Sequence, residues 1–323
     1  MSAFPPYAQL KRPDDTGLPL SWGTWGADDQ LGTLNHITPQ TVAAAAREIQ
    51  RGERFNLDLP LHEPYGVIRP DAHRRRRAPA QTLYTGSLPP HLLVRDDKLD
   101  DFFLQCSSQW DGLTHMGDAR HGFYNGVQEH QVTQREGTRN GIEHLARFGV
   151  AGRAVLADLV RHFAALGRPW HPLAEQTASA EDLAACLQRQ GVTLQPGDIL
   201  LVRMGWVAAL HAARTEDARD ALLRDWKFSG LSGEEDLWRF VWDRRVAALA
   251  TDTVTVELWP IRPGRPSLHL AIARLGLTIG EMFDLEALAE DCARDGRYTC
   301  FFTSKPLNVR GGVGSPPNAM AIK

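Results

Sequence analysis

The feature that most constrains this fold is an uninterrupted alternation of helix and strand patterns after residue 139. Apolar runs such as "GDILLVRMGW" (197–206) alternate with amphipathic segments such as "EEDLWRFVWDRR" (234–245). Chains of this kind form α/β domains, in which helices cover a sheet. We expect helices over 140–149, 179–191, 234–245, 267–276 and 285–294, and strands over 152–160, 197–206, 246–251, 277–283 and 298–304.

The earlier part of the chain is less regular. One helix is expected over 37–52, with Thr38 as its N-cap, Pro39 at its first position and Gly52 after its end. Residues 55–101 are proline-rich and charged, and long stretches of that kind usually form loops that line a site. The basic run "HRRRR" (73–77) within them favours a solvated loop.

No Gly/Ser linker and no repeat of fixed period divides the chain. We therefore expect residues 1–323 to form a single α/β domain with a mixed sheet flanked by helices. An irregular N-terminal portion, about residues 1–100, should wrap on this domain.

Charge, cysteine usage and missing motifs exclude several classes of protein. The formal net charge of -3 at pH 7 gives no general attraction to nucleic acid or to an anionic membrane. The four cysteines have no paired spacing, which is typical of reduced thiols in a cytoplasmic protein. There is no apolar run of about 18 residues that would predict a membrane span. The motifs G-x-S-x-G, G-x-G-x-x-G after a strand and H-E-x-x-H are also missing. We therefore expect a cytoplasmic protein that acts on a small molecule.

Polar residues whose side chains could bind a metal or transfer protons lie in two segments of the sequence. The stretch "QCSSQWDGLTH" (105–115) holds Gln105, Gln109, Asp111 and His115, and a later segment holds His269 and Glu281. A hydrolytic metal site needs three or four O or N ligands from different elements and a group that moves protons. Residue types alone are a weak signal in a chain with 12 histidines, and a histidine such as His269 on an otherwise apolar helix is more often a core residue than a ligand.

The arrangement of these segments resembles the metal-dependent cyclase family, which includes bacterial kynurenine formamidase and isatin hydrolase. The signature of that family, His-x-Gly-Thr-His-x-Asp-x-Pro-x-His, aligns with "QCSSQWDGLTH" without a gap. His269 and Glu281 are twelve residues apart, as the later pair of the family should be. Further likeness lies in "WGADDQLGTLN" (25–35) and "FFTSKPLNVRGGVGSPPNAMAI" (301–322), and it indicates the longer branch of the family. The resemblance implies a swivelling β/β/α fold.

The resemblance also implies roles for these residues. Asp111, His269 and Glu281 would be metal ligands, and His115 the catalytic histidine. Two metal-ligating histidines of the signature are replaced here by Gln105 and Gln109, and its proline by Leu113. Because an amide oxygen is a weaker and harder donor than imidazole, we expect one divalent ion per chain, with Mn²⁺ favoured over Zn²⁺. Gln109 is a possible fourth ligand through its carbonyl oxygen, although metal binding could also have been lost.

The implied function is a metal-dependent hydrolase of a small cyclic or aryl amide, imide or lactone. A metal-activated water would attack the carbonyl while His115 acts as general acid and base. Two other functions stay open. One is a non-catalytic small-molecule binding protein on the same fold, and the other is a ring-forming cyclase or dehydratase.

Several neighbouring residues have two interpretations. Trp110, Phe123 and Tyr124, with Gln105, could form a substrate-binding wall, or the aromatic residues could simply pack in the core. Asp118 and His121 could replace the missing imidazoles, but a surface turn is the favoured interpretation. Trp22 and Trp25 lie in a segment too short to build its own core, which predicts a homodimer or a larger homo-oligomer.

Overall fold

A nine-stranded mixed sheet forms the centre of the protein within the residues that the computed structural model describes, which are 4–64, 76, 78–86 and 91–323. The strand order is β1 (Arg54–Asn56), β13 (Ala319–Ile322), β11 (Thr299–Ser304), β5 (Val150–Asp158), β7 (Ile199–Arg203), β9 (Ala248–Thr251), β10 (Thr278–Glu281), β4 (Gln109–Asp111) and β12 (Gly314–Ser315). Strands β5, β7, β9 and β10 are parallel, and antiparallel strands extend the sheet on both sides.

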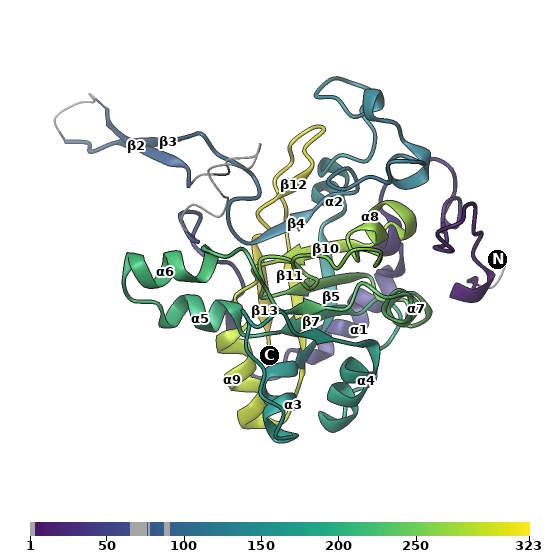
Figure 1. The fold of residues 1–323 in the computed structure, drawn as a ribbon. Coiled ribbons are helices and arrows are strands. Elements are labelled where there is room, and N and C mark those ends of the chain that lie inside the picture. Colours follow the sequence, from purple (N-terminus) through teal and green to yellow (C-terminus); the bar gives the residue numbers. More distant parts are fainter. Residues whose placement is uncertain (1–3, 65–75, 77, 87–90) are drawn as a thin grey trace.

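Helices cover both faces of this sheet (Figure 1). The helices are α1 (Pro39–Ala45), α2 (Glu143–Phe148), α3 (Leu159–Ala165), α4 (Ala180–Arg189), α5 (Trp206–Ala212), α6 (Glu216–Leu223), α7 (Glu235–Asp243), α8 (Leu270–Leu275) and α9 (Glu286–Asp295). Along β7, Leu200 and Val202 pack with α3, α4, α7 and α8, whereas Ile199 and Leu201 pack with α2 and α9. Because successive side chains of a strand point to opposite faces, a strand covered on both sides must be apolar throughout.

The predicted helices and strands of the second half are all present, with shifted ends. The expected strand 152–160 runs from Val150 to Asp158, where the Asp158 carboxylate accepts a hydrogen bond from Arg161 N and starts α3. Ser179 and Asp182 form the capping box that begins α4. The helices α3, α5 and α6 were not predicted.

The expected helix 37–52 is shorter than predicted. Thr38 and Pro39 begin it as expected, but α1 ends at Ala45 and continues only as a 3₁₀ turn, Ala46–Glu48. The chain then leaves the helix because the backbone amides of Arg51 and Glu53 bond to the carbonyl of Lys323 at the C-terminus. Tertiary pairing thus ends this helix before Gly52.

The N-terminal portion divides into a packed segment and a projecting hairpin. Trp22 donates through Nε1 to the Ala273 carbonyl, and the ring of Trp25 contacts His36 and Trp242. Both tryptophans are half-buried against their own chain. They therefore do not need a second subunit to cover them, which was the reason for predicting an oligomer. The hairpin of β2 (Ala80–Thr85) and β3 (Arg95–Asp100) extends away from the body, and every residue of both strands is exposed (Figure 1).

No described helix is both long and apolar enough to span a bilayer.

Candidate metal centre

The pairing of β4 with β10 brings two carboxylates together. In this antiparallel ladder Gln109 lies opposite Glu281, and Asp111 lies opposite Ile279. Alternate residues of a strand point to the same face, so Gln109, Asp111 and Glu281 share one face of the sheet. Gly280 faces the other side, where a Cβ atom would lie 2.7 Å from the ring of Trp110.

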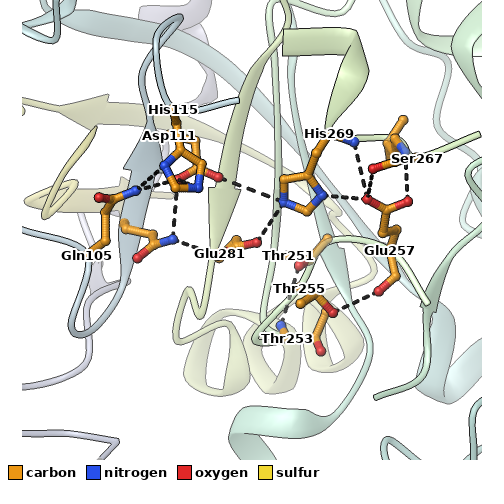
Figure 2. A network of polar contacts seen from close by, with 12 residues as sticks. Gln105, Asp111, His115, Thr251, Thr253, Thr255, Glu257, Ser267, His269 and Glu281 are labelled. Atoms are coloured by element: carbon orange, nitrogen blue, oxygen red, sulfur yellow. Dashed lines mark hydrogen bonds and ion pairs between the residues drawn. The ribbon is translucent and has the colours of Figure 1, made fainter. Parts of the chain in front are cut away.

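His269 completes this group from the start of α8. Its Nε2 atom lies 3.0 Å from Glu281 Oε1 and 3.9 Å from Asp111 Oδ2 (Figure 2). One ligand atom from each of Asp111, His269 and Glu281 lies within 4.8 Å of the others, and all three residues are buried. The predicted meeting of the segments 111–115 and 269–281 is therefore confirmed.

The electrostatics of this cluster favour a cation. Burial raises the pKa of Glu281, and the neighbouring charge of Asp111 raises it further, while His269 opposes the rise. Burial alone would lower the pKa of His269, but its hydrogen bonds to Glu257 and Glu281 raise it well above the usual value. Asp111 Oδ2 is buried and has no hydrogen-bond partner among the described residues. A buried carboxylate oxygen of this kind fits a metal ion, which would satisfy it and relieve the repulsion between the carboxylates.

The two glutamines present their amide nitrogens to the carboxylates. Gln109 Nε2 lies 2.6 Å from Glu281 Oε2 and 3.3 Å from Asp111 Oδ1. Gln105 Nε2 lies 3.2 Å from Asp111 Oδ1 and 2.7 Å from His115 Nδ1. For Gln109 to ligate a metal through its carbonyl oxygen, as predicted, its amide would have to turn over. That role stays a prediction.

His115 lies beside the cluster on the segment that follows β4. Its Nε2 atom is 3.7 Å from Asp111 Oδ1, and its side chain is 11% exposed. The ring therefore reaches the carboxylate group while keeping an opening to solvent.

Two residues near the cluster were not identified from the sequence. Glu257, which is buried, lies 2.5 Å from His269 Nδ1 through Oε1. Arg76 donates to the Gln105 carbonyl at 3.0 Å and lies 3.4 Å from Gln109 Oε1. The prediction that the basic run is a solvated loop is wrong for Arg76. Its side chain is half-buried and donates a hydrogen bond to the segment before β4. The rest of that basic run, residues 73–75 and 77, lies outside the described residues.

The aromatic residues near this segment mostly pack in the core. Trp110 is fully buried on the opposite face of β4, with its ring 4.9 Å from that of Phe283. Tyr124 is also fully buried and donates to the Asp29 carboxylate at 3.0 Å. These placements correspond to core packing instead of a substrate wall, because strand alternation turns Trp110 away from the carboxylates. Phe123 is half-buried, and its role stays a prediction.

Asp118 and His121 belong to a separate group around Arg274. Asp118 is buried and accepts from Arg274 Nε at 2.6 Å, so the surface-turn interpretation is wrong for this residue. His121 Nε2 lies 2.7 Å from Asp14 Oδ2, which also accepts from Arg274. Asp14, Asp118 and His121 could hold a metal by geometry, but the guanidinium already supplies the cation there. They do not replace the imidazoles missing from the main cluster.

Comparison with known proteins places this arrangement in a family. Residues 55–258 match the family model Cyclase ("Putative cyclase"). This span is more than half of the chain and contains the whole 105–115 segment. The chain belongs to the cyclase family. Curated proteins give no match.

Solved structures of this family share the fold. A crystal structure of a novel cyclase is 34% identical, with a TM-score of 0.81 and coverage of 94% of this chain and 99% of that one. Isatin hydrolase A from Ralstonia solanacearum is 16% identical, with a TM-score of 0.57 over 88% of this chain and 97% of its own. Isatin hydrolase A from Labrenzia aggregata, bound to benzyl benzoate, is 16% identical, with a TM-score of 0.55 over 87% and 97%. The predicted family and fold class are confirmed, and the likeness to the isatin hydrolases concerns the fold alone.

Proposed function

We propose that this cyclase-family protein is a metal-dependent hydrolase of a small cyclic or aryl amide, imide or lactone. The observation that carries the proposal is the buried group of Asp111, His269 and Glu281, in which one carboxylate oxygen accepts no hydrogen bond from the described residues. The proteins named isatin hydrolases, one of them bound to the product analogue thioisatinate, support the choice of reaction by sharing the fold.

Nε2 of His269 and carboxylate oxygens of Asp111 and Glu281 would hold one divalent ion. A ligand set with two carboxylates and one imidazole suits Mn²⁺ as well as Zn²⁺, and its oxygen content favours Mn²⁺. When bound, such an ion polarises a carbonyl group and lowers the pKa of water.

His115 is placed to move a proton at Nε2. In the neutral ring, Nδ1 accepts from Gln105 Nε2, so the proton resides on Nε2, which faces Asp111. If the Gln105 amide turns so that its oxygen accepts from Nδ1–H, Nε2 can take a proton from water and then return it to the departing nitrogen or oxygen, so the ring is neutral again at the end. Gln105 thereby selects the tautomer of His115.

The cysteine and the two serines of the 105–115 segment, Cys106, Ser107 and Ser108, are engaged in other contacts. Ser108 Oγ lies 2.5 Å from the Met282 carbonyl, and Ser107 Oγ lies 3.0 Å from the Pro60 carbonyl. Burial raises the pKa of the Cys106 thiol, which keeps it protonated. These contacts support water as the attacking group over a covalent route.

The test separates metal binding from proton transfer. We expect His115→Ala to retain wild-type metal content and lose roughly 10²-fold or more of turnover, because the ring moves a proton and does not hold the ion. Glu281→Ala should lose metal and turnover together. Metal content is measured after loading with Mn²⁺ or Zn²⁺, and turnover on a panel of lactams, imides, lactones and N-formyl anilines.

The control is His162→Ala, which removes a buried histidine of α3 that lies outside the cluster. This variant should keep both metal and turnover. If His115→Ala loses its metal as completely as Glu281→Ala, the division of roles is wrong. If the wild-type protein binds no metal but still binds panel compounds, the protein is a non-catalytic binding protein.

A further inference from the structure

The side-chain carboxylate of Glu257 accepts hydrogen bonds from one short segment of the chain, residues 267–269. This carboxylate is only 2% exposed and accepts from Leu268 N at 2.7 Å, from Ser267 Oγ at 2.6 Å and from His269 N at 3.2 Å. Its Oε1 atom also lies 2.5 Å from Nδ1 of His269 (Figure 2). All four donors therefore come from the three residues that lead into α8.

The backbone of Glu257 is itself held firmly. It pairs with Leu231 of β8 (Gly230–Leu231) in a parallel bridge, and its carbonyl accepts from Thr255 Oγ1 at 2.8 Å. Gly230 packs so closely that a Cβ atom there would lie 2.1 Å from the Glu257 carbonyl carbon. The carboxylate is thus presented by a rigid support, and sites built on rigid supports keep their geometry.

This contact decides which nitrogen of His269 faces the candidate metal centre. A carboxylate only accepts hydrogen bonds, so His269 must carry a proton on Nδ1. Nε2, which donates to Glu281 at 3.0 Å in the metal-free protein and lies 3.9 Å from Asp111, is then the nitrogen that gives up its proton and offers a lone pair when an ion binds. In metal sites, a ligating histidine commonly donates its other N–H to a carboxylate, which fixes the tautomer and raises the basicity of the ligand.

We propose that Glu257 is a positioning residue of the metal centre, which holds His269 in the Nδ1–H tautomer with Nε2 directed at the ion. The proposal rests on the metal site proposed above. In the fold, Glu257 accepts hydrogen bonds from the backbone amides of Leu268 and His269 at the start of α8. The proposal assigns it a second role, in metal affinity.

The decisive experiment compares metal affinity across matched variants. Glu257→Gln keeps the size of the side chain and removes its charge, and Ser267→Ala removes one of the four donors without touching the imidazole. Mn²⁺ is titrated into each purified full-length protein, and free Mn²⁺ is followed by electron paramagnetic resonance. We expect Glu257→Gln to raise the dissociation constant about 10- to 100-fold, the range typical for loss of such a partner, and Ser267→Ala to leave it near the wild-type value.

Thermal unfolding of the metal-free proteins guards against a purely structural effect. If Glu257 only supports the start of α8, the melting temperatures fall for both variants while Mn²⁺ affinity stays the same, and the proposal is overturned. If Glu257→Gln does not fold, Glu257→Asp takes its place, because the shorter side chain keeps the charge but loses its reach to Nδ1. An unchanged Mn²⁺ affinity in that variant would also overturn the proposal.

The same titration distinguishes this inference from the proposed function. Tight Mn²⁺ binding by the wild type with no change in Glu257→Gln leaves the metal site standing and refutes the role of Glu257. If the wild type binds neither Mn²⁺ in the titration nor Zn²⁺ in a competition assay, the metal site itself is refuted. The positioning role of Glu257 is then refuted as well.

Discussion

Arg274 offers the sharpest test of how the N-terminal segment supports the candidate metal centre. Its side chain is 1% exposed and extends from α8, the helix that follows His269. The guanidinium donates to Asp118 at 2.6 Å, to Asp14 at 2.6 Å and to the Leu18 carbonyl at 2.6 Å. Arg274 therefore connects residues 14–18 to α8, the helix that begins directly after the candidate ligand His269.

We expect Arg274→Met to destabilise the protein strongly. Removing one partner of a buried ion pair costs about 3–5 kcal/mol, because a charge is left buried without compensation. Asp118 and Asp14 are 7% and 9% exposed, and Asp14 keeps contacts with Thr16 and His121, so Asp118 should account for most of the loss. The Leu18 carbonyl loses its donor as well, which adds about 1–3 kcal/mol if water does not replace it. Remaining contacts, such as that of the Thr16 hydroxyl with Asp14, reduce the total, so we expect about 4 kcal/mol.

The measurement is the free energy of unfolding in urea, with two comparison proteins. Arg12→Met makes the same substitution in an ion pair with Glu235 whose side chains are 33% and 39% exposed, and it should cost no more than about 1 kcal/mol. The triple variant Arg274→Met, Asp14→Asn, Asp118→Asn also removes the two carboxylate charges that lose their partner. It should therefore recover much of the lost free energy of unfolding. The reasoning fails if Arg274→Met costs no more than Arg12→Met, or if the triple variant is less stable than Arg274→Met alone.

Two further predictions concern pH and assembly. Burial raises the pKa of Asp58 from 3.8 to about 6, against the opposing hydrogen bond from Ala319 N. The folded state therefore favours the protonated form, and the wild type should lose roughly 3 kcal/mol of stability as the pH rises from about 4 through 6. Asp58→Asn should flatten this part of the curve in urea unfolding, and an unchanged curve would exclude Asp58 as the cause. The chain should also be a homodimer, because the exposed β2–β3 hairpin carries Leu83, 70% exposed, and an uncovered two-stranded hairpin is marginally stable. Light scattering that gives a monomer at micromolar concentration would contradict this.

The sequence by itself determined the class of fold and the main members of the candidate site. Continuous apolar runs identify the central strands, because both faces of the sheet are buried and tolerate only apolar residues, and period-3.6 patterns identify the helices between them. The spacing within 105–115 and between His269 and Glu281 indicated the candidate ligands that the tertiary structure brings within 4.8 Å of one another. These features are local or belong to a family motif, so they can be read along the chain.

The tertiary structure alone decided what surrounds those ligands. Pattern analysis places Trp110 next to Asp111, but only the packing of β4 on Phe283 shows that the tryptophan faces the core. No local signal connects Glu257 with His269 or Arg274 with Asp14, because these contacts join segments that meet only when the sheet and α8 are assembled. Hydrogen bonds and ion pairs between distant segments depend on the relative placement of whole elements, and that placement is a property of the folded chain rather than of any stretch of its sequence.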